Sequence, residues 1–211
     1  MKKLFWKSVL LAAIITATIK SGAQPIPVEF MAGNHYATVN VVLSKNFTPT
    51  SRIGFFHLNT LTMNYTDKTK DDLALQNLLF FELTESFRVT GGAFYGTKPG
   101  FSPTAGMQYI NVGKKWFILV SPRINIESEP TFNNFLIIRY KAALTDKAML
   151  YLSLQALNLF ETNGHIKSYQ WFRTGLERKG TQFGVAFNVD EFGSKPKFSY
   201  NFGLFVRREI F

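Results

Sequence analysis

The chain has 211 residues, of which 16% are aromatic and 18% are charged, and its mean hydropathy is -0.00. The charged fraction is low for a soluble domain, where about 25% is usual, while a bundle of transmembrane helices would have a mean hydropathy well above zero. Lys and Arg outnumber Asp and Glu by 24 to 14, but no basic cluster is longer than two residues, which argues against nucleic-acid binding. The absence of cysteine excludes disulfides, thiolate metal sites and a lipid anchor on an N-terminal cysteine.

The first 23 residues have the pattern of a cleavable secretory signal peptide. A basic start at Lys2, Lys3 and Lys7 precedes an apolar stretch from Ser8 to Ile19, and small residues follow at 21–23. The apolar stretch is shorter than the roughly 20 residues that a membrane-spanning helix needs. We therefore expect cleavage after Ala23, which leaves residues 24–211 as one exported domain.

The rest of the chain alternates apolar and polar residues with a period of two, which predicts β-strands. In the clearest case Phe183, Val185 and Phe187 share one face, and small or polar residues share the other. Residues 35–46 are expected to form a strand, with a short partner at 27–32. Ten further strands are predicted at residues 52–65, 73–84, 86–97, 104–112, 115–127, 132–144, 148–160, 168–178, 181–190 and 197–207.

Strand length and connection length favour a membrane barrel over a soluble two-layer sandwich. Many predicted strands have roughly 9–13 residues, as a tilted membrane-crossing strand requires, whereas soluble strands average about 5–6. Short turns are predicted at 84–86, 112–115, 145–147 and 178–180, and longer loops at 66–72, 98–103, 128–134, 161–167 and 191–197. Short turns at one end of the strands and longer loops at the other are the arrangement of outer-membrane barrels.

The chain ends in Phe211, and in this it resembles small Gram-negative outer-membrane β-barrel proteins of the porin-like superfamily. Their last strand often ends in an aromatic residue that the barrel assembly machinery reads. The resemblance implies an all-β, up-and-down antiparallel transmembrane barrel in the cell outer membrane, with ten or twelve strands because single-chain bacterial barrels have even numbers. Outer-membrane lipid and the assembly machinery are the implied partners. Arg207 and Glu209 are in phase with Phe211, and a bulge near Arg207 and Arg208 would correct that phase.

The strand faces expected to line the barrel interior carry charged residues: Glu82, Arg88, Arg123, Glu127, Arg139, Lys141, Asp190 and Arg207. Charges there must pair and fill the barrel, or be hydrated and line a channel. Ten to twelve strands lie between the side-chain-filled barrels of about eight strands and the open channels of 16–18. We expect a narrow passive channel for small polar solutes, whose mild cationic excess favours anionic or zwitterionic ones. A non-conducting barrel whose loops bind a partner is the alternative.

Catalytic groups are sparse in this sequence. Outer-membrane phospholipases and deacylases resemble one another in a His-x-Ser pattern, which none of His35, His57 and His165 matches. His57 is expected within a strand, on the same face as Asn59, as a hydrogen-bonded wall residue rather than as a general base, and His165 in a solvated loop. Three dispersed histidines without cysteine make a zinc site unexpected. A membrane-embedded hydrolase is therefore the least favoured function, and we expect no enzyme activity, metal or cofactor.

Overall fold

Alternating side chains build strands along the whole of the described chain, which comprises residues 26–97, 99–195 and 197–210 of a computed structural model. A short 3-10 helix, η1 (Lys68–Lys70), lies between two of the strands. The strands are β1 (Ile26–Gly33), β2 (Tyr36–Asn46), β3 (Ile53–Asn64), β4 (Asp72–Glu82), β5 (Phe87–Gly96), β6 (Gly100–Val112), β7 (Trp116–Asn125), β8 (Thr131–Thr145), β9 (Ala148–Glu161), β10 (Gly164–Arg178), β11 (Thr181–Phe192) and β12 (Lys197–Ile210).

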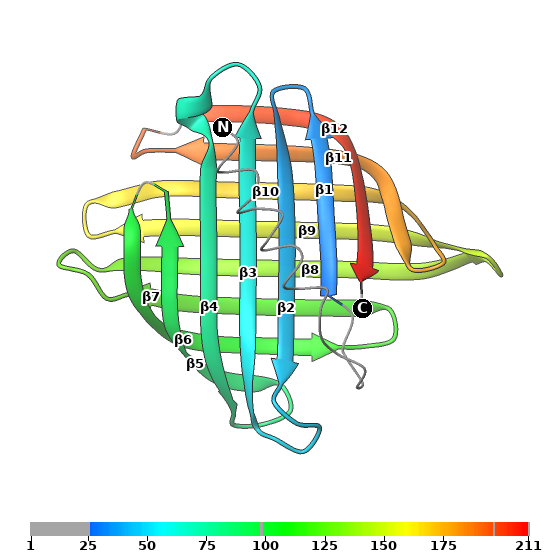
Figure 1. Ribbon diagram of the computed structural model, residues 1–211, viewed down its shortest axis with the longest axis horizontal. Coiled ribbons are helices and arrows are strands. Elements are labelled where there is room, and N and C mark those ends of the chain that lie inside the picture. The colour runs from blue at the N-terminus through cyan, green and yellow to red at the C-terminus, as the bar shows by residue number, and fades with distance from the viewer. Residues whose placement is uncertain (1–25, 98, 196, 211) are drawn as a thin grey trace, which may run out of the picture.

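Each strand pairs antiparallel with its neighbours in the chain, and β1 pairs with β12 to close the barrel. Figure 1 shows β1–β4 crossing in front of β8–β11 at a steep angle, which follows from the tilt of strands in a closed barrel. Closure leaves no unpaired strand edge, as a structure surrounded by hydrocarbon requires. The predicted all-β, up-and-down antiparallel barrel is confirmed, with twelve strands rather than ten.

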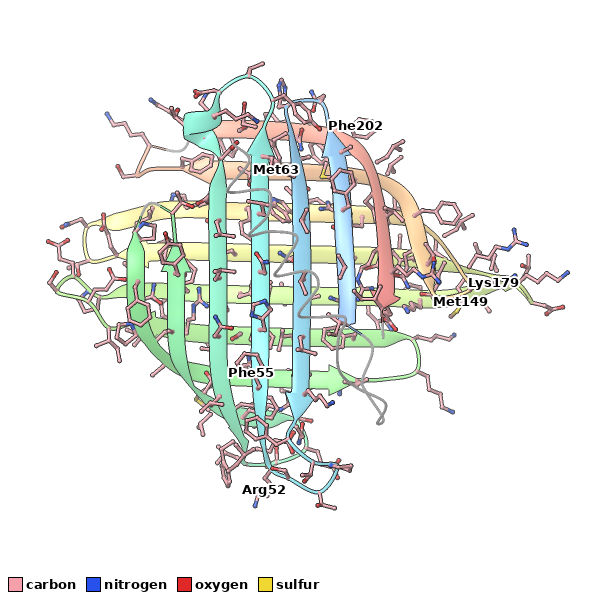
Figure 2. All side chains as sticks on the ribbon, viewed as in Figure 1. Arg52, Phe55, Met63, Met149, Lys179 and Phe202 are labelled. Carbon is pink, nitrogen blue, oxygen red and sulfur yellow. The ribbon has the colours of Figure 1, made fainter. Side chains whose placement is uncertain are left out.

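The outer face of the barrel is apolar. Side chains project from it all round (Figure 2), and Phe183, Phe202 and Leu204 have exposed fractions of 45%, 57% and 65%. So much exposed apolar surface would be costly in water, and it matches the lipid-facing band of a transmembrane barrel. Other outward residues of this kind are Phe30, Leu79, Phe81, Phe87, Val89, Phe101, Met107, Trp116, Ile124, Phe132, Leu152, Phe160, Phe172, Val185, Phe187, Tyr200 and Val206.

The interior is less polar than the sequence predicted. Polar side chains line part of it, but a buried apolar cluster fills the side formed mainly by β3–β8. The interior faces of β3 and β4 carry Phe56, Leu58, Leu78 and Phe80, all at most 9% exposed, so both faces of these strands are apolar. The whole cluster consists of Phe56, Leu58, Leu78, Phe80, Ile110, Leu119, Phe135, Ile137, Tyr169 and Trp171.

The predicted alternation of short turns and long loops is wrong in detail. We call the barrel end that holds the first residue of β1 and the last of β12 the terminal rim, and the other end the distal rim. The predicted loop at 161–167 is the two-residue turn 162–163 at the distal rim, and Pro103 lies inside β6, paired with Ala93. The terminal rim in turn has the connection 47–52. Connection length therefore does not distinguish the two rims.

The last strand needs no bulge. β12 pairs in continuous register with β1 as far as Ile210 and with β11 as far as Arg208, so there is no bulge near Arg207 and Arg208. Arg207 faces inward and Arg208 outward. The signal peptide, its cleavage after Ala23 and the terminal Phe211 lie outside the described residues. Among the described residues, no helix is long and apolar enough to cross a membrane.

Candidate functional site in the barrel interior

The interior face of β10 carries polar side chains from the distal rim to the terminal rim. Alternate positions of the strand place Lys167, Tyr169, Trp171, Arg173 and Glu177 on this face, interrupted once by a glycine. Each of them forms a hydrogen bond or ion pair with a residue of another strand. We call this row the β10 track.

At the distal rim the β10 track is bonded across the barrel. Lys167 Nζ lies 3.2 Å from Asp72 Oδ2 of β4, and β4 and β10 occupy opposite positions in the strand order. Four residues further along β10, the Trp171 indole donates to Asp190 Oδ1 at 3.3 Å. The Tyr36 hydroxyl of β2 donates to the other carboxylate oxygen at 2.5 Å. These contacts join β2, β4, β10 and β11 over the distal half of the interior.

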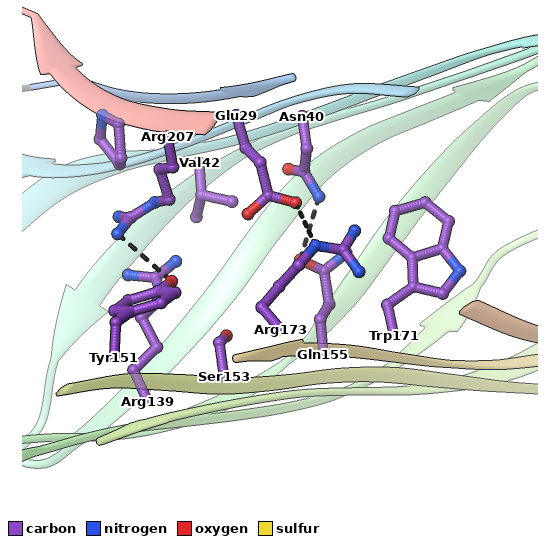
Figure 3. Close-up of a pocket in the computed structure, with 11 residues that line it drawn as sticks. Glu29, Asn40, Val42, Arg139, Tyr151, Ser153, Gln155, Trp171, Arg173 and Arg207 are labelled. Carbon is purple, nitrogen blue, oxygen red and sulfur yellow. Dashed lines mark hydrogen bonds and ion pairs between the residues drawn. The ribbon is translucent and has the colours of Figure 1, made fainter. Parts of the chain in front are cut away.

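In the middle of the barrel two further contacts cross the interior (Figure 3). Arg173 Nε lies 2.8 Å from Glu29 Oε1 of β1, and the Asn40 amide of β2 donates to Gln155 Oε1 of β9 at 3.0 Å. The Gln155 amide in turn donates to the Tyr169 hydroxyl at 3.1 Å. Two strands separate β1 from β10 and four separate β2 from β9, so these bonds join parts of the wall that are not neighbours in the sheet.

A small cavity remains beside these contacts. The volume open to the centre of a water molecule is about 20 Å³, enough for one or two waters, since each needs roughly 10–15 Å³. Besides Arg173, the side chains of Arg139 and Arg207 line it, and Arg207 Nη1 lies 3.5 Å from the Tyr151 hydroxyl. The lining residues are Pro27, Glu29, Asn40, Val42, Arg139, Tyr151, Ser153, Gln155, Trp171, Arg173 and Arg207.

At the terminal rim two ion pairs close the polar part of the interior. Lys141 Nζ of β8 lies 2.6 Å from Glu177 Oε2, where the β10 track ends. Arg88 Nη2 of β5 lies 2.7 Å from Glu82 Oε1 of β4, and its guanidinium also stacks on an interior phenylalanine ring. Charges at both rims are therefore neutralised by partners on other strands.

The structure brings some of the sequence-predicted interior charges together and separates others. Glu82 and Arg88 form one ion pair, as above, and Arg139 and Arg207 share the cavity. Glu127, near the distal rim, accepts a hydrogen bond from the Ser102 hydroxyl. The remaining three stand apart from these and from one another: Lys141 and Asp190 in the contacts described above, and Arg123, buried between β6 and β8.

Several charged residues in the interior were not among the predicted set: Glu29, Asp72, Lys167, Arg173 and Glu177. The period-two pattern of β10 was sufficient to predict Lys167, Arg173 and Glu177 as interior residues, because they alternate with the exposed Phe172 and Thr174. The additional acids pair with cations, so the expected cationic excess is smaller than the sequence suggested. Among the described residues, only Arg123 and Arg139 of the interior cations have no carboxylate within 4.0 Å.

One of the histidines agrees with expectation and another does not. His57 lies within β3 as a hydrogen-bonded wall residue, on the outer face, with its Nδ1 2.8 Å from Asn77 Oδ1 of β4. His165 is not in a solvated loop: it belongs to β10, and both of its ring nitrogens have partners. Within the described ranges, no three His, Cys, Asp or Glu residues are grouped so that they could hold a metal ion.

Comparisons with known proteins agree with this architecture. Neither known protein families nor curated protein sequences yield a match. Among solved structures, the NanC porin superimposes with a TM-score of 0.51 at 8% identity, over 90% of this chain and 100% of the porin. The KdgM porin gives 0.48 at 10% identity over 89% and 100% of the two chains. An outer-membrane channel from Pseudomonas putida F1 gives 0.47 at 12% identity over 92% and 100%. The chain therefore shares the antiparallel β-barrel fold of the NanC porin.

Proposed function

We propose that this protein is a narrow passive channel of the Gram-negative outer membrane for small polar solutes. It is exported with a signal peptide cleaved after Ala23 and is inserted by the barrel assembly machinery, which reads the last strand ending in Phe211. The fold that the chain shares with the NanC porin and the apolar outer face support this proposal.

The β10 track is the observation that carries the proposal. A barrel that serves only as a membrane anchor can be filled with apolar side chains, but here hydrogen-bonding groups continue from rim to rim along one wall. A solute moving beside this wall exchanges one set of hydrogen bonds for the next, as conduction through several weak sites requires. The apolar side chains of β3, β4 and β6–β8, which pack against Tyr169 and Trp171 of the track, narrow the interior and leave the route close to the β10 wall.

Buried polar atoms without a partner support a hydrated route. Thr38 Oγ1, Gln76 Nε2, Thr90 Oγ1, Gln108 Oε1 and Arg123 Nε have no hydrogen-bond partner among the described residues. Buried polar groups are costly unless they are hydrogen-bonded, so these atoms require water or a polar solute in the interior.

The selectivity of the channel follows from the two interior cations that lack a carboxylate. Arg123 lies between the rims on β7, where its guanidinium stacks on Phe94, and Arg139 faces the cavity. All other interior Lys and Arg side chains of the described chain lie within 4.0 Å of an acid. The channel therefore has a weak preference for anionic or zwitterionic solutes, and transport involves no covalent step.

A non-conducting barrel that binds a partner through its loops is the second candidate, and the contacts across the barrel favour it. Glu29–Arg173, Asn40–Gln155 and Asp72–Lys167 connect strands that are not neighbours, and the cavity beside the first two holds only one or two waters. If these bonds do not open on the timescale of transport, no solute passes. The channel proposal requires that they exchange with water and solute.

Planar-bilayer recording separates the two candidates. For the refolded wild-type protein we expect discrete current steps and, across a KCl gradient, a reversal potential on the side of anion preference. Exchange of both Arg123 and Arg139 for Gln should abolish that preference. The matched control is Arg178→Gln, which removes an exposed guanidinium near the terminal rim and should leave the reversal potential unchanged. Absence of current from correctly folded protein contradicts the channel and supports the non-conducting barrel.

A further inference from the structure

A row of polar side chains interrupts the apolar outer face near the distal rim. Asn134 of β8 pairs with Asn158 of β9, which pairs with Ser168 of β10, which pairs with Glu191 of β11. Beyond the row, the outer face of β10 carries the half-buried Gln170 and then the exposed Phe172, at 45%. Polar residues toward lipid are costly, so a row across four strands calls for an explanation that the channel does not supply.

A β-bulge brings a histidine to this row. The pairing of β9 with β10 shifts between His165 and Lys167, so Ile166 is the extra residue. Its carbonyl is satisfied by the amide of Gly193 at 2.8 Å. Without the bulge, residues 165 and 168 would lie on opposite faces of the strand, because the side-chain period is two. With the bulge, both residues lie on the outer face. The two residues, three apart in sequence, are then placed like residues i and i+2 of a regular strand.

The hydrogen bonds of His165 define its tautomer. Nδ1 lies 2.8 Å from the carbonyl oxygen of Gly193, and a carbonyl only accepts, so Nδ1 carries the proton. In the neutral ring Nε2 is then an acceptor, and it lies 2.7 Å from Ser168 Oγ, whose hydroxyl donates to it. The Asn158 amide lies 3.0 Å from the same hydroxyl oxygen, and a half-turn of the amide presents its NH₂ group there. Ser168 is therefore a nucleophile in hydrogen-bond contact with a base that the Gly193 carbonyl orients, and Asn158 contacts the hydroxyl itself.

We propose that Ser168, His165 and Asn158 form a second site, a serine hydrolase centre for acyl esters of membrane lipids. Ser168 Oγ attacks the ester carbonyl carbon while its proton passes to His165 Nε2. The tetrahedral intermediate then expels the alcohol, which takes the proton from the imidazole and leaves an acyl-serine. Water, deprotonated by the same nitrogen, adds to the acyl-serine, and the released Ser168 oxygen recovers a proton as the fatty acid leaves.

The surroundings fit a lipid ester. Phe132 and Phe160 form the next row toward the rim, with exposed fractions of 45% and 40%, and the Phe160 ring stands edge-on to His165 at 5.6 Å. These rings provide contact for acyl chains at the depth where the strand ends. The Glu191 carboxylate disfavours a developing oxyanion on its own side of Ser168. The oxyanion therefore forms on the opposite side of Ser168 from Glu191, where the Asn158 amide donates to it.

The decisive experiment is labelling of the refolded wild-type protein by a long-chain alkyl fluorophosphonate in detergent micelles. Mass spectrometry should place the adduct on Ser168, and because Ser168 is only 3% exposed, the adduct also shows that a reagent of ester size reaches the hydroxyl. Hydrolysis of a fluorogenic phospholipid ester should be lost with Ser168→Ala and reduced about 10²–10⁴-fold with His165→Gln. The matched control is Thr174→Ala, which removes an exposed hydroxyl from the same face of β10 and should change neither readout.

The labelling result does not depend on a variant that folds. If the folded wild-type protein takes up no reagent at Ser168, or hydrolyses the lipid no faster than Ser168→Ala, the proposal is wrong and the three residues only stabilise the bulge. Currents in planar bilayers test the channel independently, since Ser168 lies on the outer face and its substitution leaves the interior intact.

Discussion

The closing seam between β1 and β12 depends on glycine at position 203. Gly203 faces the interior opposite Gly33, and a Cβ placed on it would lie 1.9 Å from the carbonyl oxygen of Ala32 and 2.5 Å from the Cα of Gly33. An ordinary Cβ contact is at least 3.4 Å, so Gly203→Ala forces the two backbones apart by roughly 1.5 Å, a large part of the roughly 4.8 Å between paired strands. Overpacking costs about 1–3 kcal/mol, and each ladder hydrogen bond lost costs about 0.5–1.5 kcal/mol. We expect a loss of about 3 kcal/mol in the free energy of unfolding.

The matched control is Gly91→Ala, because a Cβ at Gly91 on the outer face of β5 meets nothing within 4 Å. This change should be neutral or stabilise the barrel by up to about 1 kcal/mol, since glycine within a strand costs conformational entropy. Both variants are compared with wild type by denaturant titration in micelles, with the folded fraction followed by heat-modifiable gel mobility. Equal midpoints for the two variants would show that the seam is not tightly packed at Gly203.

Two further predictions concern charged groups. Arg173→Met leaves the partly buried Glu29 without its ion-pair partner and should lower the free energy of unfolding in the same titration by up to about 3 kcal/mol, the lower end of the cost for a fully buried pair. Adding Glu29→Gln should recover part of the loss, and additive effects of the two substitutions would contradict the pairing. Hydrogen bonds from the Thr69 hydroxyl and amide hold the pKa of Asp67, in the connection between β3 and β4, below 3.8. Because the folded-state pKa is depressed, ionisation of the carboxyl stabilises this connection at pH values above the unfolded-state pKa. This stabilisation is lost as the pH falls through the folded-state pKa. Thr69→Val should raise the pKa, as an NMR titration of the Asp67 carboxyl carbon will show, and an unchanged midpoint would refute the role of the hydroxyl.

The sequence was sufficient to predict the strands because a period of two between apolar and polar residues corresponds to a β-strand with one apolar face. Phe183, Val185 and Phe187 fall on the outer face as expected, and the short strand at 27–32, extended to Ile26–Gly33, completes the twelve. The turns were harder to predict. Gly164 and His165 were expected in a long loop because glycine and a polar residue interrupt the apolar pattern, whereas the bulge at Ile166 absorbs the irregularity within β10.

The candidate sites could not be predicted fully from the sequence, for two physical reasons. Contacts such as Glu29–Arg173 join strands far apart around the barrel, and they depend on how its walls are drawn together, which strand phase does not encode. A bulge changes the face on which every later residue of the strand lies. Strict alternation would therefore place His165 and Ser168 on opposite faces, although they are hydrogen-bonded to each other. Strands that are apolar on both faces, as β3 with Phe56 is, likewise give no signal of which face is the interior.

Swelling of proteoliposomes in solutes of graded size shows whether solutes pass through the barrel interior. For the wild-type barrel we expect faster swelling than in protein-free liposomes for the smallest polar solutes, with a rate that falls steeply as solute size increases. Replacement of both Glu29 and Arg173 by Ala removes a contact across the interior without leaving a lone buried charge, and should admit larger solutes. Swelling no faster than in protein-free liposomes, for wild type and double variant alike, would contradict the claim that the interior is a route for solutes.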